Sequence, residues 1–509
     1  MKPKPKTNPV IIKRGPWTWR LRPELEEKLE SIEQAILSPQ GRANLRAVKE
    51  TGGRRTIWTL PLSPAGVQKA FIKHYSRPRF FKQLKHLVRN SRTRQEWEMG
   101  LKFEALGLPV AKHLALAERR IAGLLQEDYL VQENLEGYQN FDAWFEENLP
   151  SVISGPAVKE RRTFIERFAD LIRNMHDQGV LQRDFKPDSI MVGPGRELKF
   201  VDLERALISS RPGGLSLSRR IENLAKIDQT FGFIGSMTDR LRFLRRYFQG
   251  SKVSRDQLRK IAVEIGRRAE LNFRRRGREV RVWAHTSNTS YEQYSYRGFR
   301  VSQFISLHRK FMASVIHDLT RAACEDLVCS WEPEHPGVTI RLRGIWCDAR
   351  TALAHSPYLY YRRVPFIPAR AALYPGRGNF GFLLLEIPQQ ALLLTWKQAA
   401  KEAALRDDSV TFASELGRAL RILHRMGITW NKYTHDTMLC DPAHQDFLLR
   451  FYVSRLDHLL LDHSPSEKHA RKILTTIEDL LELSPSARRA LENSYDHCRL
   501  RWFRALDRW

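Results

Sequence analysis

The spacing of hydrophobic positions in the first part of the chain predicts a small sheet with helices inserted into it. Between residues 23 and 37, apolar side chains recur every three or four positions, which predicts a leading helix. Short runs rich in apolar and β-branched residues, separated by Gly and Pro turns, predict five strands. We expect these strands at 44–49, 56–62, 67–75, 110–118 and 121–132, with an amphipathic helix at 92–106.

A strand-rich region followed by a mainly helical one predicts an α+β fold with the two lobes of a protein-kinase-like domain. We expect the small lobe at about 40–135 and the large lobe at about 136–250, within one domain over 21–250. Before this domain, residues 1–20 are basic and contain prolines, which indicates a flexible tail. After it, residues 251–320 have the pattern of a basic helical connection.

The charge of the chain favours a polyanionic partner. The 509 residues include 85 Lys and Arg against 57 Asp and Glu, a formal net charge of +28. This balance suits nucleic acid, anionic lipid headgroups or phosphorylated glycans, and charge alone does not choose among them. A solvated, highly soluble surface is the alternative. The apolar content of 42% indicates a folded chain.

Targeting and redox features point to the cytoplasm. The basic start is not followed by an apolar segment, so we expect no secretory signal. No run reaches the roughly 18 apolar residues of a membrane span. The best candidate, 380–388, is interrupted by Glu386 and Pro388 and predicts a buried strand. The five cysteines form no CxxC motif, which indicates neither a zinc site nor a disulfide framework.

The segment 176–203 carries, in order, the residues that ATP-dependent phosphoryl transfer needs. Asp184 follows an arginine, Lys186 comes two positions later, and a second acid, Asp202, follows an apolar strand. In such a site one carboxylate orients the acceptor hydroxyl, a cation lies near the transferred phosphate, and the second carboxylate holds the metal. The alternative is a polar turn that carries two acids by chance.

Each residue of this segment has an expected role. Asp184 is the candidate base that orients the acceptor hydroxyl, and Lys186 would neutralise charge on the γ-phosphate. Asp202 would bind Mg²⁺ bridging the β- and γ-phosphates of ATP. Ser189 stands where an asparagine usually supplies a second metal-facing oxygen. A hydroxyl is a poorer ligand, so the second metal stays open, with Asp188 as an alternative ligand.

Residues upstream complete the predicted nucleotide site. Lys73 alternates with apolar residues on a strand and is expected to meet the α- and β-phosphates. Glu96, on the inserted helix, is expected to pair with Lys73, and Glu98 is the alternative partner. Gly52 and Gly53 would let backbone N–H groups approach the phosphates, although an ordinary hairpin turn explains the same two glycines.

A weak internal repeat predicts a second, degenerate kinase-like domain at 321–509. At the repeated positions Lys432 stands where Asp184 does, and the metal carboxylate is replaced within 451–454. The second copy is therefore expected to have kept the scaffold and lost the acids. An unrelated helical domain is the alternative. The segments that carry the repeat are 417–428 and 168–180.

At these residues the chain resembles the lipopolysaccharide core heptose and Kdo kinase family, which is similar in fold to eukaryotic protein kinases. The resemblance runs from about Thr56 to Tyr247. It implies an ATP-dependent, Mg²⁺-requiring kinase of Gram-negative envelope sugars that works at the cytoplasmic membrane face. Gln182 replaces the usual His before Arg-Asp, and Asp202 lacks the following Phe-Gly of protein kinases, which favours a glycan kinase. The resemblance rests on Lys73, 94–97, 107–110, 182–191, 200–205, 224–229 and 240–244.

Several functions are compatible with these features. The leading hypothesis is a phosphotransferase that uses ATP and Mg²⁺ on a sugar hydroxyl of an anionic envelope glycolipid, the lipopolysaccharide core, at the inner membrane face. One alternative is a Ser/Thr protein kinase, favoured by Lys186. Another is a non-catalytic pseudokinase scaffold, favoured by Ser189 and the acid-less repeat. Nucleic-acid binding has only the basic helices in its favour, because no recognised nucleic-acid module accompanies them.

Overall fold

The computed structural model of the chain divides into two compact units, Met1–Asn272 and Phe273–Trp509. Among the residues it describes, no helix is long and apolar enough to cross a bilayer. The described residues are 9–43, 45–51, 55–61, 69–76, 90–149, 156–185, 189–209, 213–234, 237–288, 290–304, 307, 309–322, 326–331, 340–361, 366–375, 378–387, 394–425, 427–434, 436–440, 451–461 and 465–507.

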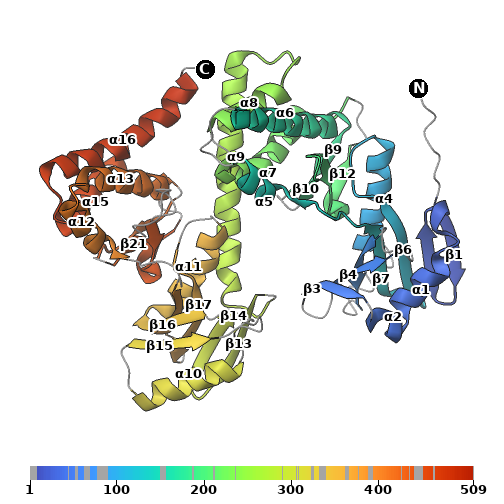
Figure 1. The fold of residues 1–509 in the computed structure, drawn as a ribbon, viewed down its shortest axis with the longest axis horizontal. Helices are drawn as coiled ribbons and strands as arrows, with labels where there is room; N and C mark the ends of the chain where they lie inside the picture. The colour runs from blue at the N-terminus through green and yellow to red at the C-terminus, as the bar shows by residue number, and fades with distance from the viewer. Residues whose placement is uncertain are drawn as a thin grey trace. The chain divides into compact units, whose positions relative to one another are not determined.

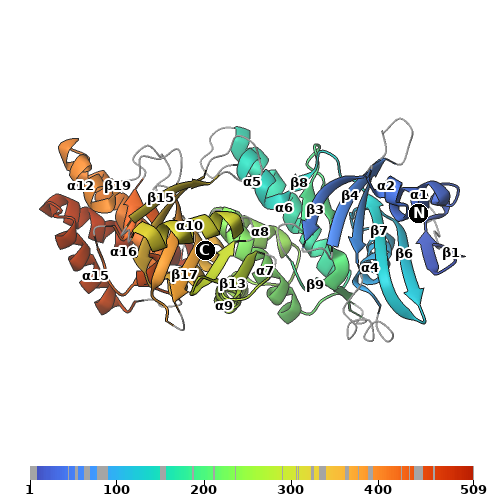
Figure 2. The same ribbon diagram turned by 90° about the horizontal axis from the view of Figure 1, so that it is seen from below.

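The first unit is built on an antiparallel sheet of seven strands, in the order β1-β2-β6-β7-β5-β4-β3. Figure 2 shows β6 and β7 side by side in this sheet, with β1 at one edge. The five strands expected from the sequence are present, each within three residues of its predicted bounds. The strands are β1 (Val10–Arg14), β2 (Trp17–Leu21), β3 (Arg46–Thr51), β4 (Arg55–Pro61), β5 (Lys69–Tyr75), β6 (His113–Ile121) and β7 (Leu124–Glu133).

The hairpin β1–β2 corrects the expectation of a flexible tail over residues 1–20. Its turn contains Gly15, whose φ of +56° suits a residue without a side chain. Strand β2 pairs with β6 and so extends the sheet. Trp19 and Leu21 alternate along β2 and are fully buried. Burying these two large apolar side chains outweighs the basic, proline-containing composition on which the expectation rested.

Helices cover both faces of this sheet. On one face α1 (Leu29–Leu37) packs Ile32 and Ile36 against the apolar side chains of β2, β5, β6 and β7. On the other face α4 (Arg92–Ala105) packs Trp97 against Leu116 and Leu130. The predicted helix at 92–106 therefore agrees with α4 to within one residue. The predicted helix at 23–37 begins later, because residues 23–25 form a short 3-10 turn instead.

The remainder of the first unit is mainly helical around an aromatic core. Figure 1 shows its longest early helix, α6, beside α8. Phe168 of α6 contacts Phe243 of α8 and Phe141 of α5. Two small sheets, β11-β10-β8 and β12-β9, lie at the edge of this core and hold the loop that contains Asp184. The elements are β8 (Gln139–Asn140), α5 (Phe141–Asn148), α6 (Pro156–Asp177), β9 (Val180–Gln182), β10 (Ile190–Val192), β11 (Leu198–Phe200), β12 (Ala206–Ile208), α7 (Leu217–Ile234) and α8 (Met237–Tyr247).

The expected helical connection at 251–320 is only partly helical. A helix of 29 residues, α9 (Arg255–Trp283), crosses the boundary between the units. It is followed by a hairpin, β13 (Tyr291–Tyr296) and β14 (Phe299–Phe304). The turn residues Arg297 and Gly298 both have positive φ, the conformation of a two-residue hairpin turn. The second unit therefore starts near residue 273 and not at 321.

The second unit contains a sheet of six strands in the order β13-β14-β17-β18-β16-β15, with helix α11 between β16 and β17. Two small sheets follow, β19-β21-β22 and β20-β23. The further elements are α10 (Arg309–Ala322), β15 (Asp326–Trp331), β16 (Ile340–Cys347), α11 (Ala349–Tyr361), β17 (Ala369–Pro375), β18 (Gly381–Ile387), β19 (Leu394–Thr395), α12 (Trp396–Leu405), α13 (Ser409–Arg425), β20 (Thr429–Trp430), β21 (Met438–Cys440), β22 (Phe451–Val453), β23 (Leu459–Leu460), α15 (Glu467–Leu480) and α16 (Pro485–Asp507).

The succession of elements in the second unit parallels that in the first. The leading hairpin β1–β2 lies beside β6, as the hairpin β13–β14 lies beside β17. The order β1-β2-β6-β7-β5-β4 thus corresponds to β13-β14-β17-β18-β16-β15. A buried side-chain pair also recurs. His176 Nδ1 lies 2.7 Å from the Tyr247 hydroxyl, and His424 Nδ1 lies 2.8 Å from the Tyr495 hydroxyl. Each pair spans 71 positions of the chain.

Candidate active site

Lys73 lies at the centre of the candidate site and contacts two carboxylates. It stands on β5 opposite Leu130 of β7, so its side chain is directed to the sheet face that α4 covers. Its Nζ lies 2.7 Å from Glu96 Oε1 and 2.6 Å from Asp202 Oδ1. Lys73 and Glu96 are almost completely buried. The structure therefore brings together three of the residues singled out from the sequence.

The two carboxylates keep Lys73 charged. Burial on its own would lower the pKa of the lysine, because a charged group loses hydration. The negative charges of Glu96 and Asp202 outweigh burial and raise the pKa of Lys73 above its usual value. A fixed ammonium group of this kind can bind the phosphates of a nucleotide.

Glu96 and not Glu98 is the partner of Lys73. Glu98 lies on another side of α4, where it accepts a hydrogen bond of 3.0 Å from Arg94 Nε and contacts the side-chain amide of Asn90. The Glu98 side chain is 40% exposed. Glu98 is thus excluded as the partner of Lys73, because its side chain lies on a different face of α4 from Glu96.

Asp202 occupies a backbone conformation that is rare for its residue type. It follows β11 and has a φ of +54° and a ψ of +59°, in the left-handed region. Residues held in this region cost free energy and are concentrated at functional sites. The Asp202 carboxylate is half exposed, in contrast to Lys73 beneath it. Gln182 donates its side-chain amide to the Asp202 backbone carbonyl at 3.0 Å.

Asp184 lies in the loop between β9 and β10, which several contacts fix. Lys226 Nζ donates to the carbonyl of Arg183 at 2.7 Å, one residue before the acid. Asp184 Oδ2 lies 3.7 Å from Arg205 Nη1, and both side chains are partly exposed. The Ser189 hydroxyl is buried and donates to the Asp184 backbone carbonyl at 3.4 Å. The Asp184 carboxylate is therefore partly exposed to solvent, while hydrogen bonds fix the backbone carbonyls of Arg183 and Asp184.

Some predicted site residues lie outside the part of the chain that the structure describes. These are Lys186, Asp188, Gly52 and Gly53. Their roles stay predictions from the sequence.

His176 has a structural place in this unit. Its Nδ1 lies 2.7 Å from the Tyr247 hydroxyl and its Nε2 lies 2.9 Å from Asn223 Oδ1. Asn223 in turn donates to the Gln182 carbonyl at 2.6 Å. Burial lowers the pKa of His176 to about 4, so the ring is neutral at pH 7. The histidine is thus linked through Asn223 to the strand that leads into the Asp184 loop.

Two residues of the site were not identified from the sequence, Gln132 and His113. Gln132 Nε2 donates to Glu96 Oε1 at 3.2 Å and contacts His113 Nε2 at 2.7 Å. Both side chains are buried. The available signal was a polar residue at the end of the apolar run 129–131, where a fully buried strand would carry another apolar side chain.

The oxygen donors present fit a hard divalent cation. Mg²⁺ is usually held by one or two carboxylates, with water and substrate phosphates completing its shell. Asp202 offers a half-exposed carboxylate beside the Lys73 ammonium group. The Ser189 hydroxyl faces a backbone carbonyl instead. Asp202 is therefore the residue that would hold the ion. A bound ion would offset the negative charge of the phosphates.

Comparison with known proteins relates part of the first unit to a described family. Residues 41–247 match the model of the lipopolysaccharide kinase (Kdo/WaaP) family. A solved structure described as WaaP in complex with acyl carrier protein is 21% identical to the chain. The match covers 48% of this chain and 97% of that one, with a TM-score of 0.36. No curated protein matches the sequence.

Proposed function

Residues 41–247 match the lipopolysaccharide kinase (Kdo/WaaP) family, and from this match we propose the reaction of the chain. The family implies an ATP-dependent kinase. We propose that the chain uses ATP and Mg²⁺ to phosphorylate a sugar hydroxyl of an anionic envelope glycolipid, the lipopolysaccharide core. The observation that carries the proposal is the position of Lys73 Nζ, within 2.7 Å of Glu96 and 2.6 Å of Asp202.

The residues of the chain would divide the work of phosphoryl transfer. Lys73, fixed by Glu96, would bind the α- and β-phosphates of ATP, and Asp202 would hold the metal ion. Asp184, on its exposed loop, would accept a hydrogen bond from the acceptor hydroxyl and orient it toward the γ-phosphate. Lys186 would stabilise the charge that develops on the transferred group.

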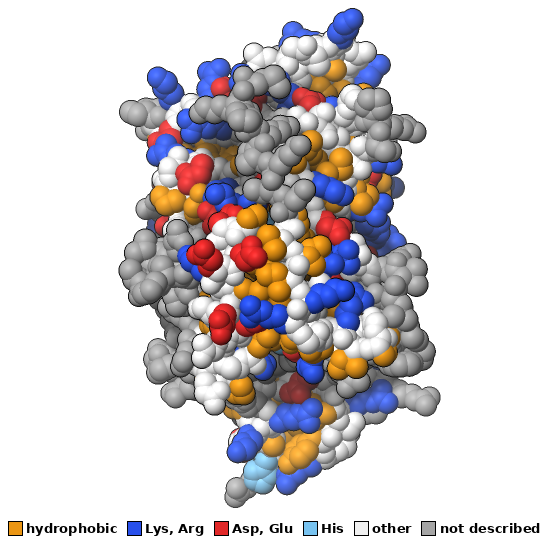
Figure 3. Space-filling model, turned by 90° about the vertical axis from the view of Figure 1, so that its right-hand side faces the viewer, with side chains coloured by type: hydrophobic (Ala, Val, Ile, Leu, Met, Phe, Trp, Pro, Cys, Tyr) orange, Lys and Arg blue, Asp and Glu red, His pale blue; other side chains and the backbone are white. Residues whose placement is uncertain are grey.

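The charge of the protein supports an anionic acceptor at a membrane surface. The net charge is +28. Figure 3 shows one face of the molecule, where Lys and Arg side chains are interspersed with acidic and apolar ones. Positive charge spread over a surface suits a layer of anionic headgroups. We therefore propose peripheral contact with the cytoplasmic face of the inner membrane, which co-sedimentation with anionic and neutral vesicles would test.

A labelling experiment tests the proposed reaction. The full chain is incubated with γ-labelled ATP and Mg²⁺, with either envelope glycolipid or a protein mixture as acceptor. Label on the glycolipid, reduced at least about 100-fold in Asp184→Asn, is the expected result. Asp256→Asn, at a side chain that is 83% exposed, is the matched control. Label on protein alone would replace the glycolipid with a protein acceptor, and no dependence on Asp184 would indicate a pseudokinase scaffold.

We also propose that the second unit is a degenerate kinase-like copy. The parallel strand order and the recurring His–Tyr pair support this. The Ser454 amide donates to the Thr437 carbonyl as the Val201 amide donates to the Ser189 carbonyl. This alignment puts a cation, Arg455, in the place of Asp202, because each of the two directly precedes a short 3-10 turn.

The replaced position is occupied by a local ion-pair cluster. Arg455 Nη2 lies 3.0 Å from Asp457 Oδ2, and Arg455 Nη1 lies 3.4 Å from Asp436 Oδ2. The same alignment puts Lys432 in the place of Asp184, five residues before Thr437 as Asp184 is before Ser189. Two cations in the place of two acids would repel a metal ion, so the second unit is not expected to transfer phosphate.

A further inference from the structure

We infer that strand β2, together with Arg22 directly after it, positions helix α4 so that Glu96 stays paired with Lys73. The inference rests on the proposed function, because it concerns the same nucleotide site. Strand β2 lies outside the residues 41–247 that match the family, so this support is added by the part of the chain that precedes them.

The two faces of β2 serve different partners. Trp19 and Leu21 point to the face covered by α1 and are fully buried there. Arg20 and Arg22 alternate with them and are directed to the opposite face. Arg20 is paired in register with Leu116, which packs against Trp97 of α4. The strand thus presents two guanidinium groups to the helix that carries Glu96.

Arg22 holds the C-terminal half of α4. Its Nε donates to the backbone carbonyl of His113 at 2.5 Å, and its Nη2 forms an ion pair with Glu104 of α4. The helix passes very close to β6 at this level. A Cβ on Gly100 would lie 2.0 Å from His113 Nδ1, so only glycine fits. Arg22 therefore joins the C-terminal end of the helix to the first residue of β6.

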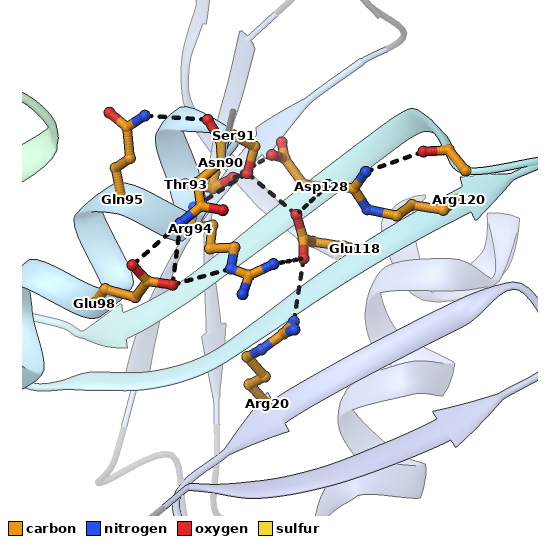
Figure 4. A network of polar contacts seen from close by, with 11 residues as sticks. Arg20, Asn90, Ser91, Thr93, Arg94, Gln95, Glu98, Glu118, Arg120 and Asp128 are labelled. Carbon is orange, nitrogen blue, oxygen red and sulfur yellow. Dashed lines mark hydrogen bonds and ion pairs between the residues drawn. The ribbon is translucent and has the colours of Figure 1, made fainter. Parts of the chain in front are cut away.

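Arg20 holds the N-terminal end of α4 through Glu118 of β6, as Figure 4 shows. Arg20 Nη1 lies 3.1 Å from Glu118 Oε2, and Arg94 of α4 lies 3.9 Å from the same oxygen. Ser91, which caps the helix, donates to Glu118 Oε1 at 3.4 Å. The beginning of α4 is thus tied to a carboxylate that β2 also contacts.

Gln132 connects the Arg22 contact to the nucleotide site. Its side-chain amide donates both to Glu96 Oε1 and to His113 Nε2. Burial, with the nearby charges of Lys73 and Arg22, lowers the pKa of His113 to about 3, so the ring is neutral at pH 7. The Gln132 amide nitrogen can only donate, so His113 Nε2 is the accepting nitrogen of this contact. A continuous path of contacts therefore runs from Arg22 through His113 and Gln132 to Glu96 and Lys73.

Amide hydrogen exchange on the nucleotide-free full chain tests the positioning role directly. In Arg22→Ala, amides of α4 are expected to exchange about tenfold faster, while those of α6 keep the parent rate. Arg22→Lys, which keeps the charge, should lie between the two. Arg14→Ala is the matched control, because Arg14 belongs to the same hairpin but reaches Glu33 and not α4. An unchanged α4, or equal acceleration in α4 and α6, would overturn the inference.

Nucleotide affinity, titrated with a fluorescent ATP analogue and Mg²⁺, separates this inference from the proposed function. Arg22→Ala should weaken binding about tenfold in the parent and have no further effect in Glu96→Gln, because both changes act on one contact. Independent, additive losses would contradict the path through Gln132. A parent chain that binds no nucleotide, but whose α4 responds to Arg22→Ala, would overturn the proposed function alone.

Discussion

Gln182 donates a hydrogen bond of 3.0 Å from its buried side-chain amide to the backbone carbonyl of Asp202. The bond joins the loop that carries Asp184 to the residue proposed to hold the metal. It also shows what replaces the histidine that kinases usually have before Arg-Asp. The amide of glutamine supplies an N–H donor at this position.

Gln182→Leu should weaken this connection without unfolding the first unit. The Asp202 carbonyl would lose its donor, at a cost of about 1–3 kcal/mol in the free energy of unfolding. Phosphate transfer should fall about tenfold, because Asp202 is no longer fixed relative to Asp184. Gln182→His, which restores an N–H donor, should recover most of the activity. Transfer assays and thermal melts of the three proteins would decide, and full activity in the leucine variant would contradict the connection.

Asp128 should make the first unit less stable as the pH rises. Burial raises the pKa of Asp128 to about 6, although the Thr93 hydroxyl donates a hydrogen bond to it. An unfolded aspartate titrates near 3.9, so the folded state binds more protons between about pH 4 and pH 6. Stability from this group is therefore present at low pH and lost as the pH rises through this window.

The variant that checks this is Asp128→Asn, which cannot ionise. At pH 8 it should be more stable than the parent by about 1–3 kcal/mol, and at pH 4 the two should converge. Chemical denaturation at both pH values measures the difference. Asp256→Asn, at an exposed position, should follow the parent at each pH. A variant that is destabilised equally at pH 4 and pH 8 would show that the charge of Asp128 is not the cause.

Two of the buried histidines, His176 and His424, should contribute to the acid sensitivity of their units. Burial lowers the pKa of His176 to about 4 and that of His424 to about 3. A neutral histidine in the folded state stabilises it above the usual pKa of about 6.5, and this contribution is lost as the pH falls toward 4. Between pH 7 and pH 4 the His176 term amounts to about 3 kcal/mol.

Glutamine substitutions separate the two units. His176→Gln should reduce the acid dependence of the first unit only, and His424→Gln that of the second, while buried His113 and His355 keep their own contributions. Hydrogen exchange followed by peptide mapping over pH 4 to pH 7 would assign each effect to its unit. Acid sensitivity that persists unchanged in both variants would mean that other groups dominate.

Replacing Lys432 and Arg455, the two cations that stand in the place of Asp184 and Asp202, should leave phosphate transfer intact. Lys432→Ala and Arg455→Ala are expected to keep the activity within about twofold and to bind one nucleotide for each chain, measured by calorimetric titration. Arg455→Ala should still lower the stability of its unit by about 1 kcal/mol, because Asp457 loses its ion-pair partner. A second bound nucleotide, or a tenfold loss of transfer, would give the second unit a catalytic part.

The features that could be predicted from the sequence are those with a local cause. Helix α4 and the strands β3 to β7 follow from apolar spacing and from Gly and Pro turns, which act over a few residues. The meeting of Lys73, Glu96 and Asp202 could be predicted from their order, because a kinase-like fold fixes where each element goes. The choice between Glu96 and Glu98 required knowing which side of α4 faces Lys73. The spacing of apolar residues along the helix did not settle this.

The features that were missed depend on contacts between distant positions. Arg22 meets His113 across 91 positions, through the pairing of β2 with β6. Gln132 and His113 are paired in register on β7 and β6, which neither segment indicates alone. The hairpins β1–β2 and β13–β14 were not predicted, because the basic composition of these segments indicated a tail and a helical connection. In the structure the buried side chains of Trp19 and Tyr291 hold the two hairpins in the fold.

The place of the β1–β2 hairpin bears on how this protein can be divided. A recombinant fragment cut to the family match would begin at residue 41 and lack Arg20 and Arg22. Its sheet would end at β6, with Glu104 deprived of Arg22 and Glu118 deprived of Arg20. We expect such a fragment to bind nucleotide more weakly, so low activity in the fragment would not count against the full chain. An expression boundary before residue 9 keeps the whole catalytic assembly in one piece.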